Sequence, residues 1–184
     1  MIILASNSPR RKELLTLGGV DFTIKSSDVD ETLPDGMTKP CEVVKYLSKI
    51  KAESVYDGDN VVIGADTVVA IDGNILGKPQ DADDAKRMLN MLSGKVHSVF
   101  TGVTIISPKG VNSFYSETKV EFYSLTDEEI DEYIRSGEPM DKAGAYGIQG
   151  KGSLLIKGIV GDYFNVVGLP LAQTVRELRN MHCY

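Results

Sequence analysis

Cysteine and histidine are scarce in this chain of 184 residues, which contains only two of each. Cys41 and Cys183 lie far apart, without the close spacing of metal-binding cysteines, so we interpret both as reduced thiols. His97 and His182 are equally isolated, and nothing in their spacing suggests a histidine-based zinc site. The sequence also shows no serine–histidine or cysteine–histidine pair of the kind that forms an activated nucleophile. These absences exclude the commonest zinc sites and catalytic triads.

Long apolar runs and an excess of positive charge are also missing. No run approaches the ~18–20 apolar residues of a membrane span. The apolar start of the chain is short and charge follows at once, so we expect no signal peptide. A net charge of −6 and a pI near 5.0 argue against a general nucleic-acid binder. We therefore expect a cytoplasmic protein, folded as one domain over residues 1–184 or as two closely joined lobes.

The first dozen residues read as a strand, a tight loop and a helix. Residues 2–5 are a short apolar run, Ser8 suits the helix N-cap, and Pro9 suits the first helical position. Residues 10–12 are Arg, Arg and Lys, although the positive end of the helix dipole favours acidic residues there. A bound phosphate would use both the free backbone N–H groups and the arginines. The alternative is a basic first turn that is simply solvated.

The rest of the chain alternates between strand and helix patterns, which is typical of an α/β protein. Asp72-Gly73 predicts a hairpin turn, and Thr126 with Glu129 forms a capping box at the start of a helix. We expect further strands at residues 21–25, 61–71, 74–77, 97–107, 112–123 and 153–159. We expect further helices at about residues 40–56, 82–91 and 126–137, and a C-terminal helix that begins at Pro170.

Asp66 and Lys51 occupy positions that ionisable residues usually avoid. Asp66 lies in the middle of the most strand-like run, which is continuous enough to be buried on both faces. A carboxylate there usually binds a metal, pairs with a cation or takes part in catalysis. The alternative is a β-bulge that exposes the carboxylate to solvent. Lys51 projects to the core side of its helix when the residues are placed 100° apart. A lysine at this position needs an anionic partner. The alternative is that its aliphatic stem extends along the protein and places the ammonium group in solvent.

Residues 140–152 are rich in glycine, so the backbone can approach a ligand closely. Asp141, Lys142 and Gln149 lie in this segment and favour ligand contact over a merely flexible connection. The segment is neither a Walker A loop nor a dinucleotide-binding motif. Carboxylates for a divalent ion, together with lysines and arginines for phosphate, are the residues that phosphoryl chemistry requires. From pattern alone we predict a metal-dependent enzyme that acts on a phosphorylated metabolite.

Several long motifs give the sequence a resemblance to a known family. In chain order they are Ser6-Asn7-Ser8-Pro9-Arg10-Arg11, Gly64-Ala65-Asp66-Thr67, Leu76-Gly77-Lys78-Pro79, residues 141–150, Gly161-Asp162-Tyr163 and Val167-Gly168-Leu169-Pro170. Over its whole length the chain resembles the Maf family of nucleoside triphosphate pyrophosphatases. The resemblance implies a mixed twisted sheet flanked by helices, with two lobes around a cleft, like inosine triphosphate pyrophosphatases. It also implies hydrolysis between the α- and β-phosphates of nucleotides, and a homodimer.

The resemblance further implies a role for each matching residue. Asp66 would be the catalytic carboxylate, acting as a base on water or through a metal, and Glu31 would help to hold that metal, Mg²⁺ or Mn²⁺. Lys51 and Lys78 would assist catalysis by binding phosphates together with the arginines. The substrate-binding residues that it implies are Ser6, Ser8, Arg10, Arg11, Thr67, Asp141, Lys142 and Gln149.

Three of these residues indicate a substrate. Arg11, Thr67 and Gln149 match the subclass of the family that acts on dTTP and UTP. The subclass that acts on 7-methyl-GTP resembles this sequence less, because it has Ser-Asp-Gln around the catalytic carboxylate. Gln149 can offer both a donor and an acceptor to a pyrimidine imide edge. Two alternatives stay open: a non-enzymatic nucleotide-binding regulator of septum formation, and a phosphatase that removes the γ-phosphate.

Overall fold

The computed structural model describes residues 1–184, which divide into two compact units. Unit 1 contains Met1–Thr67, Thr101–Ser116 and Gly168–Tyr184. Unit 2 contains Val68–Phe100 and Glu117–Val167. Each unit is therefore assembled from segments that are distant in the sequence.

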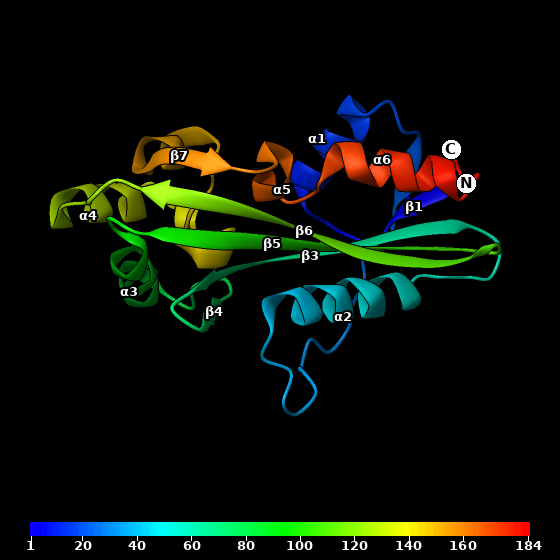
Figure 1. The fold of residues 1–184 in the computed structure, drawn as a ribbon, viewed down its shortest axis with the longest axis horizontal. Helices are drawn as coiled ribbons and strands as arrows, with labels where there is room; N and C mark the ends of the chain where they lie inside the picture. The colour runs from blue at the N-terminus through cyan, green and yellow to red at the C-terminus, as the bar shows by residue number, and fades with distance from the viewer. The chain divides into compact units, whose positions relative to one another are not determined.

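Strands and helices alternate along the chain, as the sequence predicted, and Figure 1 labels them. The strands are β1 (Ile2–Leu4), β2 (Phe22–Ile24), β3 (Val61–Ile71), β4 (Asn74–Leu76), β5 (Val96–Ser107), β6 (Gly110–Phe122) and β7 (Ile156–Val160). The α-helices are α1 (Pro9–Leu17), α2 (Pro40–Glu53), α3 (Ala82–Leu92), α4 (Asp127–Arg135), α5 (Tyr163–Val167) and α6 (Leu171–Asn180). Three 3₁₀ helices are η1 (Glu138–Asp141), η2 (Ala143–Ala145) and η3 (Gly150–Leu155). None of these helices combines the length and the apolar character that a membrane crossing requires.

The seven strands form a mixed sheet, which confirms the predicted α/β class. They are hydrogen-bonded in the order β2-β1-β3-β5-β6-β7, with β4 paired to β3. β1 runs parallel to β2 and to β3, with Ile2 opposite Val61. β4 and β7 run antiparallel to β3 and β6. The parallel pairs place the chain that leaves β1 beside the middle of β3, and this is where Asp66 lies.

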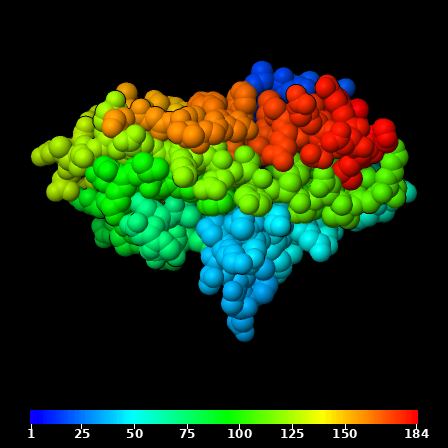
Figure 2. All heavy atoms as spheres, viewed as in Figure 1, coloured from blue at the N-terminus to red at the C-terminus, as the bar shows by residue number.

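In unit 1, helices cover both faces of the strands. α2 packs on one face, whereas α1 and α6 lie on the other (Figure 1). A Cβ on Gly18, at the end of α1, would lie 2.9 Å from Leu171 and 3.3 Å from Val175 of α6, so α6 packs closely on this glycine. The long segment that precedes α2 stands out from the surface, in light blue in Figure 2. Apolar side chains of β1, α2 and β3 are buried between the layers, so the core holds α2 firmly against the strands.

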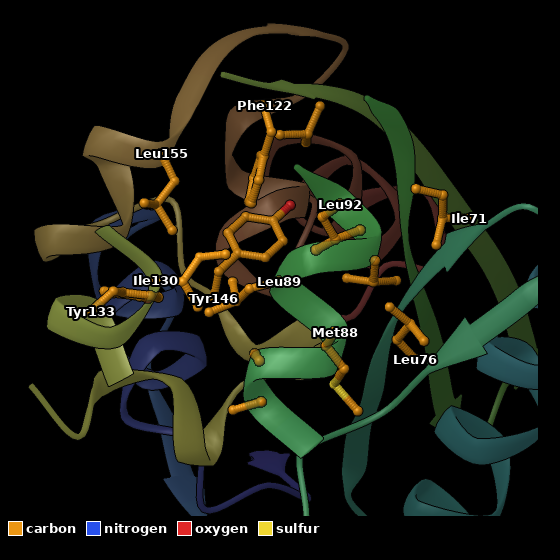
Figure 3. Packing of buried hydrophobic residues seen from close by; sticks show 14 of the residues in the cluster. Ile71, Leu76, Met88, Leu89, Leu92, Phe122, Ile130, Tyr133, Tyr146 and Leu155 are labelled. Atoms are coloured by element: carbon orange, nitrogen blue, oxygen red, sulfur yellow. The ribbon is translucent and has the colours of Figure 1, made fainter. Parts of the chain in front are cut away.

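Unit 2 has its own core, which α3, α4 and the ends of β3, β5 and β6 enclose. Figure 3 shows the Tyr146 ring in the middle of this cluster, close to Phe122 and Leu89. The rings of Phe122 and Tyr146 meet edge to face, with their centroids 4.7 Å apart. Tyr146 belongs to the glycine-rich segment, so its burial ties that segment to the core.

His97 is a core residue with a hydrogen-bond partner on one of its two ring nitrogens. Its Nε2 lies 2.6 Å from the hydroxyl of Tyr146, and the side chain is almost completely buried. Nδ1 has no hydrogen-bond partner. Burial lowers the pKa of His97 to about 4, because the imidazolium form would lose its hydration. His97 is therefore neutral in the folded protein at ordinary pH.

This burial makes stability depend on pH. In the unfolded chain His97 titrates near its ordinary pKa of ~6.5, so the unfolded state binds a proton first as the pH falls. We expect the free energy of unfolding to fall by up to ~1.4 kcal/mol per pH unit between pH ~6.5 and ~4 because of this residue. Urea titrations of wild type and His97→Gln measure the difference. His182→Gln is the control and should keep the wild-type slope; an equal slope in His97→Gln would contradict the prediction.

The C-terminal part differs from the sequence predictions in three details. The strand expected at residues 153–159 begins only at Ile156, because residues 150–155 form η3. Gly150 has a φ of 64° and its carbonyl accepts a hydrogen bond from the Ser153 hydroxyl, which favours a turn. The glycine-rich segment is built from short 3₁₀ helices and is not a simple loop. α5 was not predicted; the Asp162 carboxylate accepts from the Phe164 N–H at its start.

Candidate active site

The ion pair of Lys51 with Asp66 and Glu31 is the centre of the candidate site in unit 1. Lys51 Nζ lies 2.5 Å from Asp66 Oδ1 and 2.9 Å from Glu31 Oε1. The side chains of Lys51 and Asp66 are only 12% and 13% exposed, whereas that of Glu31 is 54% exposed. Lys51 therefore meets the anion that its core-side position requires, and Asp66 is not turned out to water on a bulge. Two carboxylates sharing one ammonium leave one net negative charge.

Two glycines allow α2 to pack so close to the sheet that Lys51 reaches Asp66. A Cβ on Gly64 would lie 2.2 Å from the Ser48 carbonyl oxygen of α2, and one on Gly102 would lie 2.2 Å from the Val44 carbonyl oxygen. The backbone of α2 thus rests directly on the backbones of β3 and β5. Because alternate residues of a strand share a face, Asp66 points to the same side as Gly64, toward α2. The close packing of α2 therefore sets the distance between Lys51 and Asp66.

Arg11, in the first turn of α1, is held from three sides. Its Nε donates to the Gly168 carbonyl at 2.8 Å, and its two terminal nitrogens donate to Ser6 Oγ at 3.2 Å and Thr67 Oγ1 at 3.1 Å. Burial lowers the pKa of Arg11 below its usual value; Asp66 and Glu31 oppose this shift and Arg10 adds to it. Arg11 thus lies close enough to the two carboxylates to interact with their charges.

No side chain caps the N-terminus of α1. Ser8 is the N-cap, as predicted, but its side chain makes no capping hydrogen bond, and the first turn contains no acidic residue. The Ser8 N–H donates instead to the buried Ser6 hydroxyl, which also accepts from Arg11. Helix N-termini with free N–H groups favour anions, and the neighbouring arginines add positive charge. This geometry supports the predicted phosphate site at the start of α1.

The other predicted site residues lie in unit 2. Lys78 follows β4 and is exposed, as are Asp141 and Gln149. The Lys142 ammonium donates to the Glu138 carbonyl at 2.6 Å and to Asp141 Oδ1 at 2.8 Å, so part of its hydrogen-bonding capacity is already used. That all four of these residues line one cleft together with Asp66 stays a prediction.

Unit 2 also contains contacts that the sequence did not indicate. The Gly144 N–H donates to the carbonyl of Gly77, the residue before Lys78. The Glu138 carboxylate accepts from the Lys151 N–H at 3.1 Å and the Gly152 N–H at 3.4 Å. These bonds give the segment around Gln149 a fixed shape. No sequence motif marks Glu138, and only the structure shows its role.

Asp66 and Glu31 suit a hard divalent cation. The structure gathers no group of three or more His, Cys, Asp or Glu side chains that could hold a metal by themselves. Mg²⁺ is usually bound by one or two carboxylates and takes its other ligands from water and substrate phosphates. The oxygen donors of Asp66 and Glu31, which Lys51 already brings together, fit that requirement. Together they would hold a divalent cation that takes its remaining ligands from elsewhere.

Comparison with known proteins gives the family. The model of the family described as "Maf-like protein" matches residues 1–181. The chain belongs to the Maf family. This Maf-family chain is 53% identical over 180 residues to a Bacillus cereus (strain G9842) protein named dTTP/UTP pyrophosphatase, covering 97% of this chain and 94% of that protein. It is 52% identical over 183 residues to a protein of the same name from Bacillus cereus (strain AH187), covering 98% and 95%.

Solved structures resemble the fold at low sequence identity. A HAM1 protein from Coxiella burnetii is 15% identical, with a TM-score of 0.54 over 97% of this chain and 98% of that one. At this identity the likeness concerns the fold alone. It agrees with the mixed sheet flanked by helices that the family resemblance implied.

Proposed function

We propose that this chain is a nucleoside triphosphate pyrophosphatase that hydrolyses dTTP and UTP to the monophosphate and pyrophosphate. The observation that carries the proposal is the contact of Lys51 with both Asp66 and Glu31, beside Arg11 in the first turn of α1. This arrangement supplies a base and cations for phosphate oxygens. The names of the Bacillus cereus relatives support the choice of substrates.

The side chains act on water and on the phosphates. Asp66 accepts a proton from a water molecule as the oxygen attacks one phosphorus atom of the α–β anhydride. A new P–O bond forms, the bridging P–O bond breaks, and monophosphate and pyrophosphate result. Lys51 has three N–H donors: two would stay with the carboxylates that Nζ meets, and the third would donate to a phosphate oxygen. A divalent cation held by Asp66 and Glu31 would supply neutralising charge at the phosphates.

The remaining residues implied by the family resemblance enter this proposal as well. Ser6, Ser8, Arg10 and Arg11 would bind phosphates, and Lys78, Asp141 and Lys142 would add charge and hydrogen bonds. Thr67 and Gln149 would favour pyrimidine nucleotides. The proposal treats residues 1–184 as a single catalytic domain that acts as a homodimer in the cytoplasm. Sedimentation of the purified chain measures the oligomeric state.

Product analysis tests the proposal directly. Incubation with a panel of nucleoside triphosphates and Mg²⁺ or Mn²⁺ should yield pyrophosphate with dTMP from dTTP and UMP from UTP. Orthophosphate as the first product would establish a phosphatase instead. Preference for 7-methyl-GTP would refute the roles given to Thr67 and Gln149. Nucleotide binding without turnover would favour the regulator, which has no need of the paired carboxylates.

Lys51→Met should weaken catalysis while keeping most of the apolar stem of the side chain. We expect kcat/KM for dTTP to fall roughly 10²-fold, because charge on the phosphates also builds up in the transition state. Stability should fall as well, by about 1–3 kcal/mol, because Asp66 loses its buried partner. The control is Lys49→Met, which removes an exposed lysine, paired at 3.6 Å with Glu53, from the same helix. Equal kinetics in the two variants would contradict the role of Lys51.

A further inference from the structure

Thr101 lies behind the candidate site and belongs to none of the motifs that mark the family resemblance. It is on β5, next to β3 in the sheet, and is completely buried. Its hydroxyl lies 2.8 Å from the hydroxyl of Thr67. The Thr67 hydroxyl in turn accepts a hydrogen bond from Arg11 at 3.1 Å. A chain of hydrogen bonds thus leads from the buried strand β5 to the Arg11 guanidinium.

We infer that Thr101 is a positioning residue, which orients Arg11 for substrate by fixing the hydroxyl of Thr67. This inference rests on the proposed function, because it needs Arg11 to bind the nucleotide.

The chemistry of the three groups explains the effect. Arg11 can only donate hydrogen bonds, so Thr67 must present a lone pair to it. Thr67 Oγ1 keeps a lone pair for Arg11 whichever of the two threonines donates to the other. What Thr101 supplies is a fixed partner that selects one χ1 rotamer of Thr67. Without it, rotation about χ1 can turn the Thr67 methyl group toward Arg11 in place of the oxygen.

Arg11 depends on such positioning because its planar group is held by separate partners. Nε donates to Gly168 and one terminal nitrogen donates to Ser6. The other terminal nitrogen donates to Thr67. These bonds use three of the five N–H donors of a guanidinium, which leaves two for a ligand. Loss of the Thr67 contact would let the guanidinium plane tilt about the remaining two hydrogen bonds, to Gly168 and Ser6. The direction of the two donors left for substrate would then be less well defined.

The test compares three variants on one strand. Thr101→Val removes the hydroxyl and keeps the shape, whereas Thr101→Ser keeps the hydroxyl. Thr104→Val is the matched control: Thr104 is on β5, is completely buried, and its hydroxyl lies 2.9 Å from those of Ser48 and Ser113, away from Arg11. Both valine variants therefore lose one buried hydroxyl and should lose similar stability.

We expect Thr101→Val to raise KM for dTTP about tenfold, which corresponds to ~1.4 kcal/mol, with kcat changed less than about threefold. Thr104→Val should keep KM within about twofold of wild type, and Thr101→Ser should restore it. A second measurement needs no activity: the Arg11 Nε–H, bonded to Gly168, should exchange with solvent faster in Thr101→Val but not in Thr104→Val.

The two measurements separate this inference from the proposed function. Equal changes in KM and in Nε–H exchange for the two valine variants would overturn the role of Thr101 while leaving the pyrophosphatase intact. If Thr101→Val changes neither KM nor Nε–H exchange, the role of Thr101 is likewise overturned. A wild-type protein that releases no pyrophosphate would overturn the proposed function. The exchange rate of the Arg11 Nε–H would still decide whether Thr101 holds the guanidinium in place.

Discussion

Asp66→Asn should abolish most of the pyrophosphatase activity while the protein stays folded. Asparagine keeps the shape of the side chain but cannot accept a proton from water or hold a divalent cation as a carboxylate does. Loss of the general base alone reduces the rate by about 10²–10⁴-fold, and loss of cation binding adds to this. Steady-state kinetics with dTTP and Mg²⁺ measure the effect. Activity within about threefold of wild type would rule out the mechanism.

Stability provides the second readout for this variant. If Asp66 were an isolated buried charge, its replacement by asparagine would stabilise the protein. Asp66 is, however, paired with Lys51. We therefore expect a small loss, since the lysine keeps only the exposed Glu31. The control is Asp72→Asn in the hairpin turn after β3, where the carboxylate pairs with Lys95 and is 64% exposed. It should change neither activity nor stability beyond ~0.5 kcal/mol.

Gly64→Ala should cause a large loss of stability, although it adds only a single methyl group to a strand of unit 1. The new Cβ would lie 2.2 Å from the Ser48 carbonyl oxygen and 2.8 Å from the Ala52 nitrogen, both backbone atoms of α2. Rotation of a side chain cannot relieve this, so the helix must move away from β3. Overpacking of a core costs about 1–3 kcal/mol and more where backbone must shift. Activity should fall too, because α2 carries Lys51.

Two further variants check this explanation. Gly158→Ala is the control: Gly158 is also in a strand, but a Cβ there meets nothing within 4 Å. It should be neutral or slightly stabilising. Ala52→Gly should not rescue Gly64→Ala, because the closest obstacle is the Ser48 oxygen and not the Ala52 methyl group. Urea unfolding of the variants measures both effects, and a rescued double variant would show that α2 does not rest on the strand backbone.

The sequence predicted those parts of the site that depend on regular geometry. Helix periodicity alone indicated that Lys51 faces the core and needs an anion, and the apolar run around Asp66 indicated a buried carboxylate. The contact between them confirms both interpretations. Their pairing was not predictable from pattern, because it depends on how closely α2 approaches β3. That distance is set by Gly64 and Gly102, which lie on different strands.

Other features depend on contacts that carry no local signal. Thr101 is an ordinary strand residue in the sequence, and its contact with Thr67 depends on β5 lying next to β3 in the sheet. The 3₁₀ helices around Gln149 have neither helix nor strand periodicity, so the sequence indicated only a glycine-rich segment. The sequence analysis allowed for two lobes but did not indicate where they divide, since the long strands β3, β5 and β6 each contain residues of both units. The roles of the site residues stay predictions until kinetics test them.

The bond between Arg11 and Gly168 has a consequence for synthesis of the chain. Its two residues are 157 positions apart, and unit 1 takes its last segment from Gly168–Tyr184. During translation the N-terminal part emerges first, but the acceptor for Arg11 Nε and the helix that packs on Gly18 come last. A nascent or truncated chain therefore has all the carboxylates and lysines of the site without an oriented Arg11. We expect Arg11 to gain its third hydrogen-bond partner only after Gly168 has left the ribosome.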